Sequence, residues 1–279
     1  MPAILHREPA GVAQRVSGRT ADRVADSGPC LGRTAHRGVS AAHALWISGV
    51  RMIVELRLTM PPKVVGVVLA AGKSVRMGSR KASLAIDGRD TYLTRLLRTF
   101  GEAGGLAETV AVLGHDASAV EAELLQAGLA VRCVVNHGFE AGQLSSLIVG
   151  LESAALPGVE AILLGLVDAP LVSARTVQAV LGRYLETGAP VVRPVRGPQH
   201  GHPVLIDRAL FGAIRQADPT VGAKPIVRAH VSPSGDVEVD DDGAFMDLDT
   251  REAHERAMRW WRTRRADLSP VALAAPDPR

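Results

Sequence analysis

The chain has 279 residues, of which 47% are hydrophobic and only 3% aromatic, with 32 basic and 29 acidic side chains. This length allows one or two domains with a large core that is packed mainly by aliphatic side chains. No cluster of Lys and Arg with interleaved aromatic residues is present, which argues against a nucleic-acid partner. No apolar run approaches the length of a membrane span, which argues against a membrane protein.

The basic character of the chain belongs mainly to residues 1–59, which hold eight of the basic and four of the acidic residues. Only Ala41–Leu58 has helical or strand-like character there. A secretory signal needs a longer apolar core and a small-residue cleavage site, and an organellar transit peptide is poor in acids. We expect residues 1–59 to be disordered or loosely attached, with Met60 as the true start of the protein. The alternative is an N-terminal extension that is specific to this protein.

Residues 60–265 form the predicted domain, and residues 266–279, rich in proline and small residues, a flexible tail. The two cysteines, Cys30 and Cys133, are too few and too isolated for a disulfide framework or a zinc site. We expect a cytoplasmic protein.

After Met60 the chain alternates between strand and helix patterns. Strands are predicted at 64–69, 109–113, 131–135 and 161–167, and helices at 91–100, 117–126, 144–155 and 173–186. Ser173 is the expected N-cap of the last of these helices, and Gly188 its stop. The alternation predicts an α/β fold with an open, mostly parallel, Rossmann-like sheet and helices on both faces, in three layers. Ligands of such sheets bind at the carboxyl ends of the strands.

The pattern changes after Gly188. Short strands are predicted at 190–195, 203–206 and 236–239, and helices at 208–216 and 250–262. Gly101, Gly104 and Gly105 are expected to end the helix that starts near Thr91.

A basic, glycine-bearing segment follows the first strand of the domain and contains Lys73, Arg76, Arg80 and Lys81. Backbone N–H groups in such loops bind phosphate oxygens, arginine adds a two-pronged grip, and lysine adds a mobile charge. The segment therefore predicts a polyphosphate site at the carboxyl end of the strand.

The glycine spacing of this segment excludes two familiar phosphate motifs. Gly78 is followed by Ser79-Arg80 rather than by Lys and Ser or Thr, so the P-loop pattern fails. The dinucleotide pattern G-x-G-x-x-G is absent as well.

Asp168 ends a strongly apolar strand and is followed by Pro170. A carboxylate at such a place is costly unless a partner stabilises it, and Mg²⁺ prefers one or two carboxylates together with phosphates and waters. Asp168 is therefore a candidate metal ligand, and a turn or N-cap role ahead of Ser173 is the alternative.

Asp247 and Asp249 would point to one side if they lay on a strand, and could then complete a metal site. Asp249 could equally be the N-cap of the last helix. The neighbouring run of acids, residues 240–242, is expected to form a solvated turn.

Three further polar groups are candidate substrate contacts. His202 stands between Gly201 and Pro203, where the backbone is constrained, and could contact a phosphate group of a ligand. Ser145 and Ser146 begin a helix and could bind a ribose or a base, although simple capping would explain one of the two serines. Asn136 ends the preceding strand and is expected to face the nucleotide.

The segment Leu69–Lys81 resembles L-A-A-G-x-S-x-R-M-G-x-x-K, the signature of the MobA-like nucleotidyltransferases. The matching positions are Leu69, Ala70, Ala71, Gly72, Ser74, Arg76, Met77, Gly78 and Lys81. Four further segments are similar to motifs of the same family. They are D-x-P at Asp168, G-H-P at Gly201–Pro203 and G-x-x-S-S-L-x-x-G-L at Gly142–Leu151. The fourth is D-I-D-T-P, which begins at Asp247 and in which Arg251 replaces the usual proline. The resemblance covers about Val64 to Arg259.

The resemblance implies a GT-A-like nucleotidyltransferase fold and Mg²⁺-dependent nucleotidyl transfer. The chain looks most like the molybdenum-cofactor cytidylyltransferases, because Ala71 stands where guanylyl-transferring relatives carry glycine. This implies CTP as the donor, the terminal phosphate of molybdenum-molybdopterin as the acceptor, and a molybdenum hydroxylase as a candidate recipient of the product.

The resemblance also implies a role for each residue of this chain that matches a family motif. Arg76 and the Gly72–Gly78 loop would hold the β- and γ-phosphates, Lys81 would offset charge at the α-phosphate, and Asp168, with Asp249, would hold Mg²⁺. The remaining nucleotide contacts are expected at Leu69, Ala70, Ala71, Gly72, Ser74, Gly78, Asn136, Ser145 and Ser146, with His202 as a further catalytic candidate.

Three other functions stay open on the sequence alone. One is guanylyl transfer to molybdopterin, and another is nucleotidyl transfer to a different phosphorylated acceptor, such as a sugar phosphate. The third is a non-catalytic module that binds nucleotide or cofactor during molybdoenzyme maturation.

Overall fold

The computed structural model describes residues 42–47, 50–55, 62–73, 80–129 and 131–268. The chain divides into two compact units, Met1–Thr59 and Met60–Arg279. In the first unit, β1 (Ala42–Ile47) and β2 (Val50–Glu55) pair antiparallel, within the segment that has strand-like character in the sequence. Residues 1–41 and 269–279 lie outside the described residues, so the disorder expected there stays a prediction.

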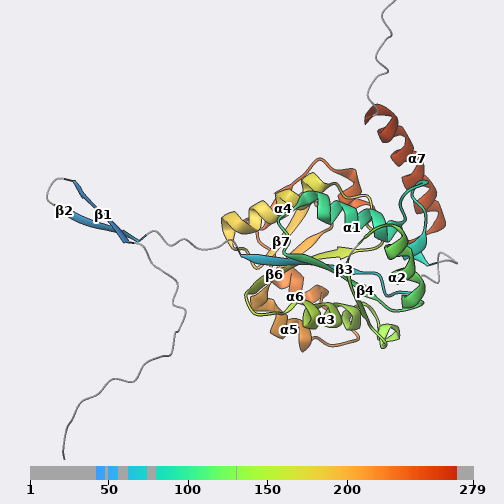
Figure 1. Ribbon diagram of the computed structural model, residues 1–279, viewed down its shortest axis with the longest axis horizontal. Coiled ribbons are helices and arrows are strands. Elements are labelled where there is room, and N and C mark those ends of the chain that lie inside the picture. Colours follow the sequence, from blue (N-terminus) through green and yellow to red (C-terminus); the bar gives the residue numbers. More distant parts are fainter. Residues whose placement is uncertain (1–41, 48–49, 56–61, 74–79, 130, 269–279) are drawn as a thin grey trace, which may run out of the picture. The chain divides into compact units, whose positions relative to one another are not determined.

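The second unit is built on one eight-stranded sheet (Figure 1). Its strands are β3 (Lys63–Leu69), β4 (Glu108–Leu113), β5 (Arg132–Val135), β6 (Val159–Leu166), β7 (Val191–Arg196), β8 (Gln199–His200), β9 (Val204–Asp207) and β10 (Asp236–Glu238). The order is β10-β7-β9-β6-β3-β4-β5, and β8 pairs with β7. Within this sheet β9 runs antiparallel to β6 and β7, and β8 antiparallel to β7, while the other pairs are parallel. The predicted open, mostly parallel sheet is confirmed.

Helices cover both faces of this sheet, as predicted. One face is covered by α1 (Tyr92–Ala103), α2 (Ala117–Gln126) and α4 (Ala174–Thr187), and the other by α3 (Gln143–Ala154), α5 (Phe211–Arg215) and α6 (Lys224–Ala229) (Figure 1). The last helix is α7 (Arg251–Leu268). No helix in the described ranges combines the length and the apolar character that crossing a bilayer requires.

The apolar strands are explained by two cores, one on each face. In β3, Val64 and Val68 pack in the core beneath α1 and α4, whereas Val65, Val67 and Leu69 pack in the core beneath α3. Because side chains of a strand alternate between faces, a strand buried on both sides reads as a continuous apolar run.

Local capping signals are partly as predicted. The Ser173 hydroxyl accepts from the Thr176 N–H at 3.2 Å, and Gly188 ends α4 in the left-handed region at φ 60°. The expectation for Gly101 is wrong, because α1 continues through it to Ala103 and ends at Gly104 with φ 67°. The helix α7 reaches Leu268, past the predicted end at 262.

Close backbone contacts bring three distant segments together at the carboxyl edge of the sheet. A Cβ on Gly201 would lie 2.0 Å from the Ala244 carbonyl oxygen, and one on Gly243 would lie 1.9 Å from the Leu171 oxygen. The His202 N–H donates to the Ala244 oxygen at 2.9 Å. These contacts leave no room for side chains, so the segments around residues 168–172, 201–203 and 243–249 meet at short range.

A glycine pair tests the packing of the two helix layers. A Cβ on Gly150 in α3 would lie 2.5 Å from Val67 Cγ1, whereas a Cβ on Gly182 in α4 would meet no atom within 4 Å. We expect Gly150→Ala to destabilise the fold by about 1–3 kcal/mol through overpacking, and Gly182→Ala to stabilise it by up to about 1 kcal/mol through helix propensity. Urea unfolding of both variants measures the two signs, and equal effects would contradict the described packing.

Candidate active site

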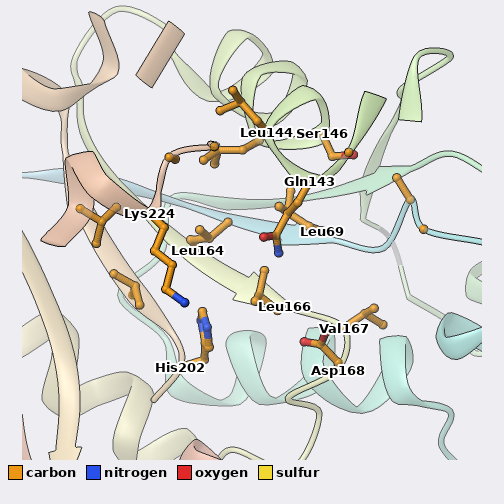
Figure 2. A pocket seen from close by; sticks show the side chains of 18 of the residues that line it. Leu69, Gln143, Leu144, Ser146, Leu164, Leu166, Val167, Asp168, His202 and Lys224 are labelled. Atoms are coloured by element: carbon orange, nitrogen blue, oxygen red, sulfur yellow. The ribbon is translucent and has the colours of Figure 1, made fainter. Parts of the chain in front are cut away.

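A cavity of about 1100 Å³ lies at the carboxyl ends of β3 and β6 (Figure 2). Its lining includes Leu69–Gly72 after β3, the start of α3, and Leu164–Asp168 at the end of β6. The opposite side is lined by His202, residues of β9, and α6. Pockets for single small ligands occupy about 300–1000 Å³, so this cavity is at the upper end of that range.

Three carboxylates converge at one end of this cavity. Asp168, Asp247 and Asp249 each offer one oxygen, and these oxygens all lie within 4.8 Å of one another. The Leu248 N–H donates to the Asp168 carbonyl oxygen at 2.9 Å, which fixes the segment before α7 against the end of β6. Oxygen ligands lie about 2.1 Å from Mg²⁺, so opposite ligands are about 4 Å apart. The limit of 4.8 Å is slightly wider than this, so a small inward movement of the side chains would let the three oxygens hold one divalent cation.

Lys81 joins this cluster from the short 3-10 helix Lys81–Ser83. Its Nζ lies 3.5 Å from Asp168 Oδ2 and forms a closer ion pair with Asp249 Oδ1. The Lys81 side chain is 13% exposed, so the ammonium is held beside the carboxylates with little access to bulk water. The cluster thus combines acidic oxygens that suit a metal with a cation that suits a phosphate.

The geometry around Asp249 decides between its two expected roles. The Thr250 hydroxyl accepts from the Ala253 N–H at 3.2 Å, so Thr250, not Asp249, caps α7. Residues 246–249 form no strand, and the two carboxylates reach the same place through an irregular segment. The assumption that Asp247 and Asp249 lie on a strand was therefore wrong, although their side chains do lie close together.

The acidic run 240–242 is not the solvated turn that we expected. Asp241 accepts from the Ser173 N–H at 2.8 Å and from the Thr176 hydroxyl at 2.6 Å. Asp242 pairs with Arg196 at 2.7 Å. These bonds hold the segment before Asp247 and Asp249, and Asp240 is the exposed member of the run.

His202 lines the cavity with a shielded imidazole. Its Nδ1 is buried and has no hydrogen-bond partner among the described residues. Burial lowers the pKa of His202 below its ordinary value, and the nearby charge of Asp168 opposes this shift only in part. The backbone of Leu164 opposes the shift as well, so burial is the dominant cause and favours the neutral form of the ring.

The predicted nucleotide contacts divide into three groups. Leu69, Ala70, Ala71 and Gly72 line the cavity. Ser74, Arg76 and Gly78 lie outside the described residues, so their roles stay predictions. The third group, around the start of α3, differs from the expectation.

At the start of α3, Ser146 lines the cavity, but Asn136 and Ser145 do not. The Asn136 side-chain amide donates to Ser145 Oγ at 2.9 Å and to Ser146 Oγ at 3.0 Å, and its oxygen accepts from the Gly138 N–H at 2.9 Å. Asn136 is buried and satisfied within the protein, so it fixes the loop before α3. Asn136 thus reaches the cavity only through its bond to Ser146, and a contact between Asn136 and a nucleotide stays a prediction.

Sequence reasoning missed several residues that line the cavity. Gln143, the first residue of α3, extends into it (Figure 2). Arg193, Lys224 and Arg228 add positive charge on the side of α6. The pair Lys224-Pro225 is a helix-start signal, but nothing in the sequence indicates that this six-residue helix packs over the sheet.

The fold and the site define an α/β protein of nucleotidyltransferase type. Residues 66–234 match the family of the MobA-like NTP transferase domain, and the chain belongs to this nucleotidyltransferase family. The matched range includes Lys81, Asp168 and His202 but ends before Asp247 and Asp249. No curated protein sequence matches the chain significantly.

Solved structures with a similar fold include two mycobacterial proteins. Rv0371c from Mycobacterium tuberculosis H37Rv is 27% identical with a TM-score of 0.59, covering 71% of this chain and 98% of that one. Its homologue from Mycobacterium sp. strain JC1 is 28% identical with a TM-score of 0.56, covering 72% and 98%. Rv0371c has also been solved in complex with manganese, at 26% identity and a TM-score of 0.55, covering 71% and 98%.

The carboxylate cluster predicts a specific pattern of metal binding. We expect Asp168→Asn and Asp249→Asn each to weaken Mn²⁺ binding at least about tenfold, because loss of a direct ligand costs no less than loss of a residue that supports one. Asp240→Asn is the matched control, since this exposed carboxylate lies outside the cluster. Titration followed by electron paramagnetic resonance measures the affinity, and equal binding by all three variants would contradict the site.

Proposed function

We propose that this protein is a divalent-metal-dependent nucleotidyltransferase that transfers CMP from CTP to the terminal phosphate of molybdenum-molybdopterin and releases pyrophosphate. The observation that carries this proposal is the meeting of Lys81, Asp168 and Asp249 in the cavity that begins at Leu69–Gly72. A nucleoside triphosphate bound along this cavity would present its phosphates to one lysine and one acidic cluster.

The proposed reaction makes modest demands on the protein. An oxygen of the acceptor phosphate attacks the α-phosphorus, the bond from that phosphorus to the bridging oxygen breaks, and pyrophosphate leaves with the electron pair. A phosphate anion is already deprotonated, so no strong general base is needed. Catalysis therefore depends on alignment and on neutralising negative charge.

The acidic cluster and Lys81 would divide the work of neutralising charge. Asp168 and Asp249, with Asp247 beside them, would hold a divalent cation, and the cation would supply charge neutralisation and orientation of the phosphates. The manganese complex of Rv0371c supports a divalent ion in a protein of this fold. Mg²⁺ also prefers oxygen ligands. Lys81, already beside the two carboxylates, would place its ammonium at the α-phosphate.

The choice of CTP rests on the family resemblance and on the wall of the cavity. Ala71 is buried, and its oxygen and methyl group lie close to Gly114, so the position is filled where guanylyl-transferring relatives carry glycine. Gln143 extends into the cavity, and its amide offers both a donor and an acceptor that suit the polar edge of cytosine (Figure 2). Molybdopterin as acceptor, and a molybdenum hydroxylase as recipient, follow from the resemblance alone.

The measurement is release of pyrophosphate from CTP with Mg²⁺ and molybdenum-loaded molybdopterin. We expect turnover with CTP above that with GTP, and a fall of about 10²–10³ in kcat for Lys81→Gln, because one charge-stabilising donor is removed from the transition state. Lys63→Gln, at the opposite end of β3, is the matched control.

Two outcomes would change this assignment. Turnover with GTP alone would identify GTP as the donor and guanylyl transfer as the reaction. Nucleotide binding without any pyrophosphate release would contradict the enzyme and favour an accessory module.

A further inference from the structure

The last helix, α7, is held to the domain by a core of its own, apart from the two cores on the faces of the sheet. The buried members of this third core are Ile86, Tyr92, Leu171, Leu248, Ala257 and Met258. Within residues 251–264, whose exposure is described, Ala257 and Met258 are the buried residues, and the last turns of α7 extend beyond the other elements of the unit (Figure 1). A helix with so few buried contacts belongs to the less stable parts of a fold, so each contact contributes a large share of its docking.

The two segments that carry the carboxylates also contribute to this third core. Leu171 is three residues after Asp168, and Leu248 stands between Asp247 and Asp249. Both leucines are buried. A shift of the third core would therefore move the segments that hold the three carboxylates.

Tyr92, the first residue of α1, joins the third core to the segment of Lys81 and to α7. Its N–H donates at 2.9 Å to the oxygen of Leu84, three residues after Lys81. Its side chain is fully buried, and its hydroxyl and His254 Nδ1 form a hydrogen bond of 2.6 Å. Burial raises the pKa of Tyr92 and lowers the pKa of His254, so it favours the neutral form of both groups, and neutral groups can form this bond.

The first turn of α7 connects His254 to Asp249. The His254 N–H donates to the Thr250 oxygen at 2.9 Å, and the Thr250 hydroxyl accepts from the Ala253 N–H at 3.2 Å. Asp249 directly precedes this hydrogen-bonded turn. Because the bonds hold the turn together, a displacement of α7 would carry the Asp249 carboxylate with it.

The carboxylate cluster acts on the position of α7 in return. Without a cation the three carboxylates repel one another, and a bound cation replaces this repulsion with attraction to all three. Cation binding would therefore draw the segment of Asp249 inward and favour the docked helix. Linkage is reciprocal, so docking of α7 would strengthen cation binding by the same factor.

We propose that Tyr92 and His254 are positioning residues that couple the docking of α7 to cation binding among the three carboxylates. The domain binds its cation tightly while α7 is docked, and the bound cation holds α7 in place. Neither residue lines the cavity; both act through the position of Asp249. This inference rests on the metal site of the proposed function and adds a control on that site.

Titration of the full-length protein with Mn²⁺, followed by electron paramagnetic resonance, tests one direction of the coupling. We expect Tyr92→Phe and His254→Ala each to weaken Mn²⁺ binding about three- to tenfold, the factor that corresponds to one hydrogen bond. The double variant is expected to bind no more weakly than the weaker single variant, because the two residues form one contact.

A conservative variant separates the hydrogen bond from the helix itself. His254→Asn keeps an acceptor close to the place of Nδ1, and we expect its Mn²⁺ affinity to be within about twofold of the wild type. Ala favours a helix more than Asn does. A loss with Ala and a rescue with Asn therefore cannot arise from helix propensity.

Tyr184→Phe is the matched control. The Tyr184 side chain is also buried, and its hydroxyl also forms a hydrogen bond of 2.6 Å, to Asp207 Oδ2. Asp207 pairs with Ala161 near the start of β6, so this bond lies at the end of the strand opposite Asp168. We expect Tyr184→Phe to lower the free energy of unfolding as Tyr92→Phe does, but to leave Mn²⁺ affinity unchanged.

Tryptophan fluorescence tests the other direction of the coupling. The chain has three tryptophans, of which Trp260 and Trp261 lie on α7 and pack, partly buried, against the third core. In a Trp46→Phe background the emission therefore reports on α7 alone. We expect Tyr92→Phe to shift this emission to longer wavelength without a cation, and saturating Mg²⁺ to return it toward that of the wild type.

The outcomes that reject the coupling differ from those that reject the proposed function. Unchanged Mn²⁺ affinity in Tyr92→Phe and His254→Ala would reject the coupling, as would an emission that Mg²⁺ does not move in Tyr92→Phe. An equal loss of affinity in Tyr184→Phe would assign the effect to a general loosening of the fold and reject it too. Intact coupling without pyrophosphate release from any nucleoside triphosphate would reject the proposed function alone, whereas wild-type protein that binds no Mn²⁺ would reject both.

Discussion

The convergence of like charges at the end of β6 is the constraint on which the site depends. Asp168, Asp247 and Asp249 bring their oxygens within 4.8 Å of one another, from two segments far apart in the sequence. At an effective dielectric constant near 20, two such charges repel by roughly 3 kcal/mol. Lys81 offsets part of this repulsion through its contacts with Asp168 and Asp249. An arrangement that concentrates negative charge in this way is suited to hold a cation.

The rest of the domain supplies the rigidity that this arrangement needs. The backbone contacts at Gly201 and Gly243 and the bond from Leu248 to Asp168 hold the segment with Asp247 and Asp249 against the sheet. Asp241 adds a second anchor by bonding to Ser173 and Thr176 at the start of α4. Because these contacts are backbone contacts or partly buried hydrogen bonds, the fold sets the position of the segment that carries the carboxylates.

Much of the fold was predictable from the sequence. A strand that is buried on both faces is apolar throughout, and in a helix that packs on a sheet the apolar residues recur every three to four positions. The elements from β3 to α4 follow this rule, and Ser173 and Gly188 mark the ends of α4 by local chemistry. The short α6 was not predicted, because six residues carry too little periodicity. The same limit hid Lys224 and Arg228, whose place over the sheet depends on tertiary packing.

Site residues were predicted correctly where the neighbouring sequence indicates their surroundings. They were missed where their surroundings are formed by segments that are far apart in the sequence. Asp168 at the end of an apolar strand is a local signal, and the structure places it in the carboxylate cluster. Asn136 carried a similar signal but bonds to Ser145 and Ser146, a choice that only the three-dimensional neighbourhood reveals. Asp241 and Asp242 lay in a run that reads as solvated, yet each has specific partners.

The central claim is that one divalent cation binds among the carboxylates beside Lys81, within the cavity assigned to the nucleotide. A crystal of the full-length protein soaked with Mn²⁺ and the α,β-methylene analogue of CTP tests it directly through the anomalous signal of manganese. The account predicts one strong peak among Asp168, Asp247 and Asp249, with the phosphates of the analogue beside it. A peak elsewhere, or an analogue bound away from Lys81, would contradict it.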